Sequence, residues 1–224
     1  MATARVRVSK PLRDSPEGAL AATRRKPRQS RAKASSDALQ EAFVRVLIEK
    51  GYDGVTVREV AAVAGVGIGT FYEYVGNKQA LAALTIHLRV KALAQTLQTG
   101  IAALQGRSSG ELVAALLDQQ VAQVMNDAQA WAALFMVERT VSTPQAYRKH
   151  YDQFVTLWQQ ALAAASDAGT DEQVAEQARM VHAISYGWIT QSLLTQGAGL
   201  DRIALLREMK RAVLAYLQHG LRVA

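Results

Sequence analysis

The fold is decided by one stretch of the sequence, TVREVAAVAGVGIGTFYEYVGNK, which runs from Thr56 to Lys78. Thr56 and Glu59 have the spacing of a capping box, in which a hydroxyl and a carboxylate satisfy the first free N–H groups of a helix. We therefore expect a helix to begin just after Thr56. Gly65 occupies the position of a C-terminal glycine, so this helix is expected to be short.

A second short helix is expected at about 68–75, because Gly76 interrupts the pattern that follows. Gly65 allows a sharp turn between the two helices, since glycine accepts a positive φ. Two short helices joined by such a turn predict a helix-turn-helix, whose second helix enters the major groove of DNA. Gly67 and Gly69 keep the start of that second helix thin, so its backbone is able to approach the DNA closely.

The remaining sequence predicts helices almost throughout. Alanine, leucine and glutamine are frequent, and no alternation of β-branched residues predicts a strand. The first helix carries apolar residues on one face and ends at Gly51, and Asn77 is placed to cap a long fourth helix. Capping patterns and glycines predict further helices at about 109–126, 128–141, 144–169, 171–196 and 201–220. The expected fold class is all-α, with an N-terminal three-helix domain that contains the helix-turn-helix and a helical C-terminal domain.

The formal net charge of +7 is concentrated at the N-terminus. Residues 1–33 hold ten basic and two acidic residues, whereas the rest of the chain is close to neutral. The same segment contains three prolines and little apolar periodicity, so residues 1–32 are expected to form a disordered basic arm. A basic arm on a neutral body favours a polyanionic partner, but many such arms only increase solubility. Both interpretations of the arm stay open at this point.

The composition argues against several classes of function. The chain has no cysteine, which excludes disulfides and thiol nucleophiles, and its four histidines lack metal-ligand spacing. We expect neither a metal nor another cofactor. Paired carboxylates and phosphate-binding loops are also missing from the sequence, so we do not expect an enzyme. No apolar run is long enough to cross a bilayer and no signal core is recognisable, so a cytoplasmic protein without a membrane partner is expected.

The segment from Gly51 to Leu81, GYDGVTVREVAAVAGVGIGTFYEYVGNKQAL, resembles the DNA-binding domain of the tetracycline-repressor (TetR) family. The family pattern has an apolar second helix, Ala-Gly-Val, a small-residue turn into Gly-Thr, an aromatic residue before Tyr, and then Lys and Leu at the start of the next helix. The resemblance covers about residues 33–93. It implies a DNA-binding domain over 33–93, with the helix-turn-helix at about 56–75, and a regulatory ligand-binding and dimerisation domain over 94–224.

The resemblance also implies a set of DNA-binding residues. Thr56 is expected to hold a phosphate, and Arg58 to contact a guanine, for which the guanidinium has bidentate geometry. Ile68 suits a thymine methyl group, and the hydroxyl of Tyr72 suits a phosphate oxygen. The full set is Thr56, Arg58, Gly67, Ile68, Gly69, Thr70, Tyr72, Tyr74, Asn77 and Lys78.

Two positions depart from the family pattern. Gly67 stands where a serine or threonine cap is usual, which weakens the helix start by roughly a few tenths of a kcal/mol and leaves fewer polar groups for base recognition. Val75 stands where phenylalanine is more frequent. The alternatives for the contact residues are ordinary solvated positions for Arg58 and Lys78, and a partly buried position for Tyr72.

The second half of the chain is rich in aromatic residues: nine of the fourteen in the sequence lie after residue 126. Their helical spacing is typical of a core, and the family resemblance adds a small-molecule pocket. The residues expected to line that pocket are Trp131, Phe135, Arg139, Tyr151, Phe154, Trp158, His182 and Tyr186. If Arg139 faces inward, an anionic or carbonyl-bearing effector is favoured. His182 is alternatively a hydrogen-bonded core residue.

The resemblance implies a homodimer formed through the last two helices, at about 171–196 and 201–219. Ala178, Ser185 and Gly187 are small enough to allow two helices to approach closely there. The expected function is a ligand-responsive repressor that binds a palindromic double-stranded DNA operator and is released when an effector, of unknown identity, repositions the fourth helix. The alternatives are an activator, a DNA-binding protein of low specificity and a helical enzyme that uses the aromatic cavity.

Overall fold

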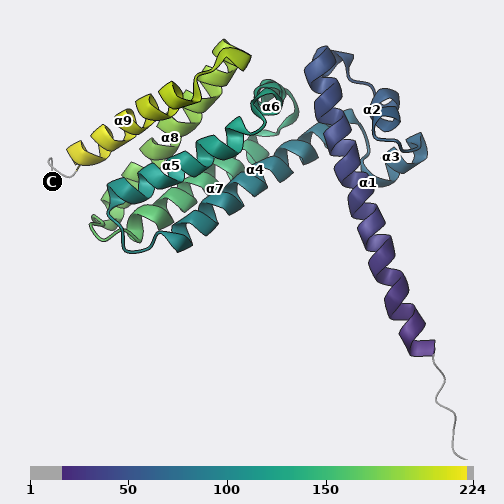
Figure 1. Ribbon diagram of the computed structural model, residues 1–224, viewed down its shortest axis with the longest axis horizontal. Helices are drawn as coiled ribbons and strands as arrows, with labels where there is room; N and C mark the ends of the chain where they lie inside the picture. Colours follow the sequence, from purple (N-terminus) through teal and green to yellow (C-terminus); the bar gives the residue numbers. More distant parts are fainter. Residues whose placement is uncertain (1–16, 221–224) are drawn as a thin grey trace, which may run out of the picture.

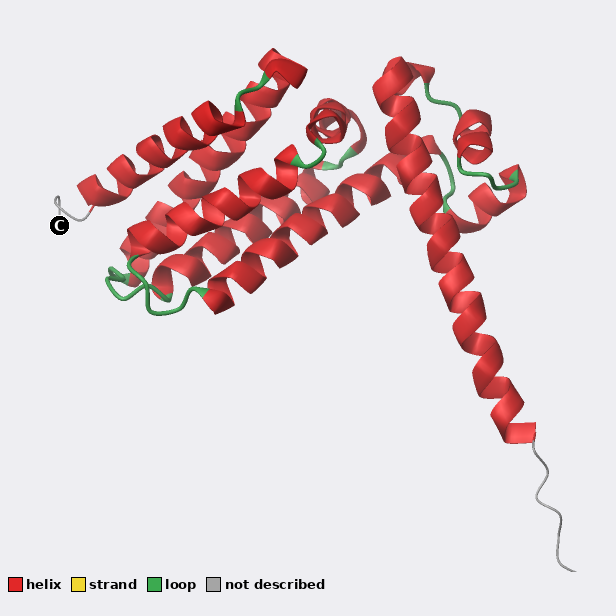
Figure 2. Ribbon diagram, viewed as in Figure 1, coloured by secondary structure: helices red, strands yellow, loops and turns green. Residues whose placement is uncertain are grey.

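The structure, a computed structural model, describes residues 17–220, and every regular element in that range is helical (Figure 2). The expected all-α fold class is therefore confirmed. The elements are α1 (Glu17–Gly54), α2 (Val57–Val63), α3 (Ile68–Tyr74), α4 (Lys78–Ala103), α5 (Ser109–Met125), α6 (Ala128–Val141), α7 (Pro144–Ala163), α8 (Asp171–Gln196), the short 3-10 helix η1 (Gly197–Gly199) and α9 (Arg202–Gly220). Within residues 17–220, no helix combines the length and the apolar character needed to span a bilayer.

Local capping chemistry sets most helix starts where the sequence predicted them. Ser108 and Thr170 each form a complete capping box, with Glu111 and with Gln173 respectively. The Asn77 side chain accepts a hydrogen bond from the N–H of Ala80 at 2.8 Å and so begins α4. These starts were predictable because a cap involves residues only three positions apart.

The end of α7 differs from the sequence prediction. α7 ends at Ala163 rather than at Gly169. The segment that follows leaves the helix because it serves the start of α5: the Asp167 carboxylate accepts from the Ser109 N–H at 2.6 Å, and the Ser166 N–H donates to the Arg107 carbonyl at 2.9 Å. A contact between residues 58 positions apart is not visible in a local pattern.

The helices form two groups that are joined by the long helix α4 (Figure 1). At one end, α1, α2 and α3 bury Leu39, Phe43, Val60 and Phe71, which are part of the same continuous apolar core as the residues of the bundle. At the other, α5, α7, α8 and α9 pack with the C-terminal half of α4 into a bundle. The expected domain boundary at 93/94 falls inside the continuous helix α4, so this helix belongs to both parts.

The short helix α6 is a second connection between the two parts. It packs against α1 on one side and against α4 and α8 on the other (Figure 1). An ion pair between Arg89 of α4 and Asp127, the residue before α6, holds its start at 2.8 Å. The sequence did not reveal this connection, because it depends on how α6 crosses α1 in space.

The N-terminal arm differs from its prediction in the part that the structure describes. α1 begins at Glu17, so residues 17–32 are helical rather than disordered, and this part of α1 extends away from the other helices (Figure 1). Good helix formers such as alanine and arginine outweigh the single internal proline there. The first sixteen residues of the predicted arm lie outside the described residues.

Candidate DNA-binding surface and effector cavity

The turn between α2 and α3 is built on a glycine in the left-handed region. Gly65 has φ +68°, and its N–H donates to the Ala62 carbonyl at 3.1 Å. The next N–H, that of Val66, donates to the Ala61 carbonyl at 3.0 Å. A residue with a Cβ atom is strained at this φ, so the turn that sets the angle between the two helices requires glycine.

The start of α2 has half of the predicted capping box. The Thr56 hydroxyl accepts from the Glu59 N–H at 3.2 Å, as expected. The Glu59 carboxylate does not return to the Thr56 N–H and instead forms an ion pair with Lys50 of α1. The pair joins α2 to α1, because α1 lies close enough to offer a charged partner.

One buried side chain anchors α3. Phe71 is completely buried in the apolar core, whereas Ile68 and Tyr72 of the same helix are 44% and 57% exposed. The Tyr72 ring packs edge-on against Phe71, with 5.4 Å between centroids. The helix therefore presents one face, including the start at Gly67 and Gly69, to the surroundings of the protein.

The predicted DNA-binding residues lie in and beside α2 and α3 and at the start of α4. Exposed members are Thr56, Arg58, Gly67, Ile68, Gly69, Tyr72 and Asn77, and half-buried members are Thr70, Tyr74 and Lys78. Thr56 and Asn77 also cap the helices that follow them. Seven of the ten are thus exposed, and their contacts with DNA stay predictions.

Lys78 has a partner within the protein. Its ammonium group donates to the Tyr52 carbonyl at 3.0 Å and lies 4.5 Å from the centroid of the Tyr52 ring. These contacts tie the start of α4 to the C-terminal end of α1. The sequence prediction of a free phosphate-binding lysine did not foresee them, because Tyr52 is 26 residues away.

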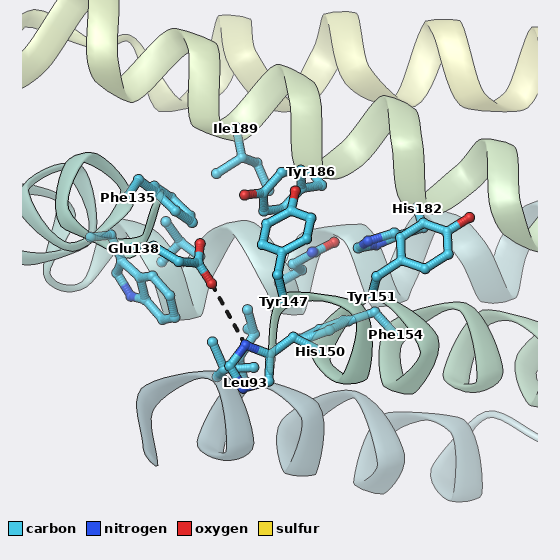
Figure 3. Close-up of a pocket in the computed structure, with 14 residues that line it drawn as sticks. Leu93, Phe135, Glu138, Tyr147, His150, Tyr151, Phe154, His182, Tyr186 and Ile189 are labelled. Carbon is cyan, nitrogen blue, oxygen red and sulfur yellow. Dashed lines mark ion pairs between the residues drawn. The ribbon is translucent and has the colours of Figure 1, made fainter. Parts of the chain in front are cut away.

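A cavity lies in the C-terminal part, bounded by α4, α5, α6, α7 and α8 (Figure 3). The space that a water molecule is able to occupy inside it is about 60 Å³. Six of the eight residues predicted for a pocket lie on its wall: Trp131, Phe135, Tyr151, Phe154, His182 and Tyr186. Residues on the wall that the sequence reasoning missed are Val90, Leu93, Gln120, Val124, Glu138, Tyr147, His150 and Ile189.

The other two predicted residues lie elsewhere. Arg139 is exposed and, with Arg148, borders a depression on the outer surface. That depression adjoins the cavity and shares three lining residues with it: Glu138, Tyr147 and Tyr151. Trp158 is 1% exposed and belongs to the core of the bundle rather than to the cavity wall. An anionic or carbonyl-bearing effector was favoured only if Arg139 faced into the pocket, and Arg139 does not line the cavity.

The cavity wall is a chain of aromatic rings centred on His182. The His182 ring stacks on Phe154 with 5.7 Å between centroids and lies 5.3 Å from Tyr151 and 5.7 Å from Tyr186. Burial lowers the pKa of His182 to about 4, so its ring is neutral at pH 7. Burial and a hydrogen bond with Tyr147 raise the pKa of Tyr186.

Glu138 is a buried carboxylate on the same wall. It is 5% exposed, and its Oε1 lies 3.6 Å from Nδ1 of His150 (Figure 3). Nε2 of His150 in turn lies 3.4 Å from Nδ1 of His87. Burial and the neighbouring His150, Lys149 and Lys91 lower the pKa of His87. The helical spacing of α6 could have identified Glu138 from the sequence. Residues 131, 135 and 138 share one face of the helix, whereas residue 139 is turned by about 100° from residue 138.

Comparison with known proteins agrees with this geometry. Residues 40–84 match the family model described as bacterial regulatory proteins, tetR family. No curated protein sequence matches the chain. The structure is similar to that of the fatty acid degradation regulator FadR from Bacillus halodurans, with 18% identity and a TM-score of 0.67 over 80% of this chain and 94% of that one.

Two further solved structures have the same architecture. A TetR-like transcriptional regulator from Rhodococcus sp. RHA1 is 16% identical, with a TM-score of 0.62 over 82% of this chain and 96% of its own. A TetR-family transcriptional regulator from Streptomyces coelicolor is 17% identical, with a TM-score of 0.61 over 83% and 99%. At these identities the similarity establishes the fold, including both the helix-turn-helix part and the helical bundle.

Proposed function

We propose that this chain, whose residues 40–84 match the tetR family model and whose fold is that of TetR-like regulators, is a repressor that binds a palindromic operator as a dimer and is released by a small molecule. The observation that carries the proposal is the exposed face of α3. It is held in place by a single buried anchor, Phe71, and by a glycine turn of fixed geometry. Such a helix is suited to the major groove.

On this proposal the two short helices divide the work of recognition. Ile68, Gly69 and Thr70 face base edges at the start of α3, and Arg58 at the start of α2 donates to guanine. Thr56, Tyr72, Tyr74, Asn77 and Lys78 fix the register through phosphates. Lys78 exchanges or shares its bond with the Tyr52 carbonyl when a phosphate approaches.

The dimer uses the outward face of α8. Its large apolar side chains Met180, Trp188 and Leu194 are exposed, as is Ile203 at the start of α9. The interface predicted from small residues needs a correction. Ala178 and Ser185 are fully buried within their own protomer, so of the three predicted positions only Gly187 lies toward the outward face.

The repressor leaves DNA when the cavity opens. At about 60 Å³ the cavity is far below the roughly 300–1,000 Å³ of a typical ligand site, so an effector has to separate the helices around it. Two of those helices reach the DNA-binding part, since α4 enters it and α6 packs against α1. An effector shifts the equilibrium only if it prefers the open form.

Selection of bound duplexes from a random pool tests DNA recognition. We expect a palindrome whose half-sites are separated by one or more helical turns. At fixed salt, the selected duplex should bind roughly 10³-fold or more tightly than a shuffled duplex, which separates a repressor or activator from a protein of low specificity. A ratio near one would reject specific regulation. In vitro transcription from a promoter that contains the selected site then distinguishes repression from activation.

Substitution of Arg58 by alanine tests the assigned contact. It should weaken binding to the selected duplex by about 1–3 kcal/mol and relax the preference for guanine at one position per half-site. The exposed Arg45 of α1, which pairs with Glu49, offers a matched control, because its replacement by alanine removes the same charge outside the proposed surface. Unchanged base preference in the Arg58 variant would remove this contact from the proposal.

A further inference from the structure

The cavity wall carries a negative charge without a fixed positive partner. Among the described residues that line the cavity, Glu138 is the one acidic residue and none is a lysine or arginine. Arg139 and Arg148 line an adjoining outer depression that Glu138 also borders, but neither forms an ion pair with it within residues 17–220. The ion-pair partner of Glu138 in that range is His150, and the 3.6 Å between Oε1 and Nδ1 exceeds a normal hydrogen bond. A buried carboxylate without a close positive partner lowers the stability of the folded protein.

Other polar atoms on the wall also lack partners. In the part of the chain that the structure describes, three polar atoms of the cavity wall are buried and have no hydrogen-bond partner: Gln120 Oε1, His150 Nδ1 and His182 Nδ1. Gln120 Oε1 accepts hydrogen bonds, and the rings of His150 and His182, when neutral, accept at Nδ1 in the tautomer that is protonated at Nε2. The cavity therefore offers acceptors and a negative charge, and a ligand that satisfies them has to supply donors.

The remaining wall is aromatic. Trp131 and Phe135 lie with 5.5 Å between centroids, and Phe135 and Tyr186 meet edge to face at 5.9 Å. Figure 3 shows Glu138 beside Phe135, with Tyr147 and Tyr186 close to it across the cavity. Aromatic faces attract cations, and the rings give an apolar body large surfaces to pack against.

We propose that the cavity binds an organic cation, a protonated amine on an aromatic or other apolar body, whose N–H groups donate to Glu138. This inference rests on the proposed function, because it names the chemical class of the effector for the same cavity. An anionic ligand of equal shape brings a second negative charge toward Glu138 and leaves the acceptors unsatisfied. An inward Arg139 would have favoured an anionic effector, whereas Glu138 on the cavity wall favours a cationic one.

Matched ligands of opposite charge test the proposal on the full chain. Isothermal titration calorimetry at pH 7.5 compares benzylammonium, 1-naphthylmethylammonium and 4-phenylbenzylammonium with the acetates that carry the same ring systems. At least one ammonium should bind, and its affinity should exceed that of its acetate by about tenfold or more. Three ring systems are used because the cavity has to expand around its ligand.

Replacement of Glu138 by glutamine identifies the group responsible. The substitution keeps the shape and removes the charge, so ammonium affinity should fall by about 10- to 100-fold while acetate affinity does not fall. Glu49→Gln removes the charge of an exposed glutamate on α1 and should leave both affinities unchanged. Circular dichroism checks that each variant is folded. If the Glu138→Gln variant does not fold, the preference of the unmodified protein for ammonium or acetate ligands decides whether the cavity is a cation site.

The outcomes separate this inference from the proposed function. Preference for the acetates, equal binding of both series, no binding of any ammonium, or full ammonium affinity in a folded Glu138→Gln variant would overturn the cation site. Release of the selected duplex is measured separately by fluorescence anisotropy. An ammonium that binds through Glu138 without releasing DNA would support the cation site and reject effector-controlled release.

Discussion

Replacing Gly69 by alanine tests whether the thin start of α3 serves DNA approach rather than folding. Gly69 is the second residue of α3, and no atom lies within 4 Å of a Cβ built on it. The added methyl group therefore neither clashes nor becomes buried. The remaining effect is on the backbone: alanine in a helix is more favourable than glycine by about 0.5–1 kcal/mol. The variant should be more stable, with a melting temperature higher by roughly 1–4 °C.

DNA binding should change in the opposite direction. The methyl group stands on the exposed face of α3, where it holds the helix away from base edges whose contacts are each worth about 1–3 kcal/mol. Fluorescence anisotropy with the selected duplex should show a Kd raised by about tenfold or more. Thermal unfolding followed by circular dichroism measures the stability of the same sample.

Two other glycines provide the controls. Gly110 is also the second residue of its helix, α5, and its added Cβ would meet only Leu214 at 3.7 Å, so Gly110→Ala should stabilise similarly and leave DNA binding unchanged. Gly65→Ala should destabilise by about 1–2 kcal/mol, because φ there is +68°. If Gly69→Ala bound the duplex as tightly as the unmodified protein, the role given to the thin helix start would be refuted.

Three further substitutions test other parts of the structure. Trp188→Glu places a charge on the 46% exposed apolar side chain of α8, and light scattering should then report single chains of 24.3 kDa, whereas an unchanged dimer would move the interface elsewhere. Phe71→Ala should destabilise the DNA-binding part by about 3–5 kcal/mol in urea unfolding, against about 1 kcal/mol for Phe71→Leu; equal losses would deny that the ring anchors α3. His182 has a pKa of about 4 when folded and about 6.5 when unfolded, so the unfolded chain takes up the extra proton as pH falls between these values. Stability should therefore drop by about 2 kcal/mol from pH 7 to pH 5 through this residue, and His182→Gln should remove that part of the slope.

Local chemistry explains why much of the fold was predictable from sequence. Asn77, Ser108 and Thr170 cap helices through neighbours three positions away, and the turn at Gly65 depends on that residue's own freedom. The accessible surface of α3 follows from the same short stretch, since Phe71 had to be buried and Tyr72 then faced outward.

Features that depend on distant contacts were not predictable. Glu59 pairs with Lys50 because α1 packs beside α2, and Lys78 turns to the Tyr52 carbonyl for a similar reason. In the cavity, the aromatic pattern identified the right helices but not how each one is rotated. An error of one position on α6 exchanged the buried Glu138 for the exposed Arg139, and with it the sign of the charge offered to a ligand.

The continuity of α4 has a mechanical consequence. Its 26 residues make a rod about 39 Å long, and Val90 of the cavity wall lies about 18 Å along it from Lys78. A tilt of about 5° with its fulcrum near Val90 swings the Lys78 end by about 1.6 Å. In a two-fold dimer the swings of both arms add to about 3 Å, close to the 3.4 Å step between base pairs. If the chain binds an operator as the proposed dimer, a slight parting of the helices around the cavity is thus enough to shift its two DNA-reading helices by nearly one base-pair step.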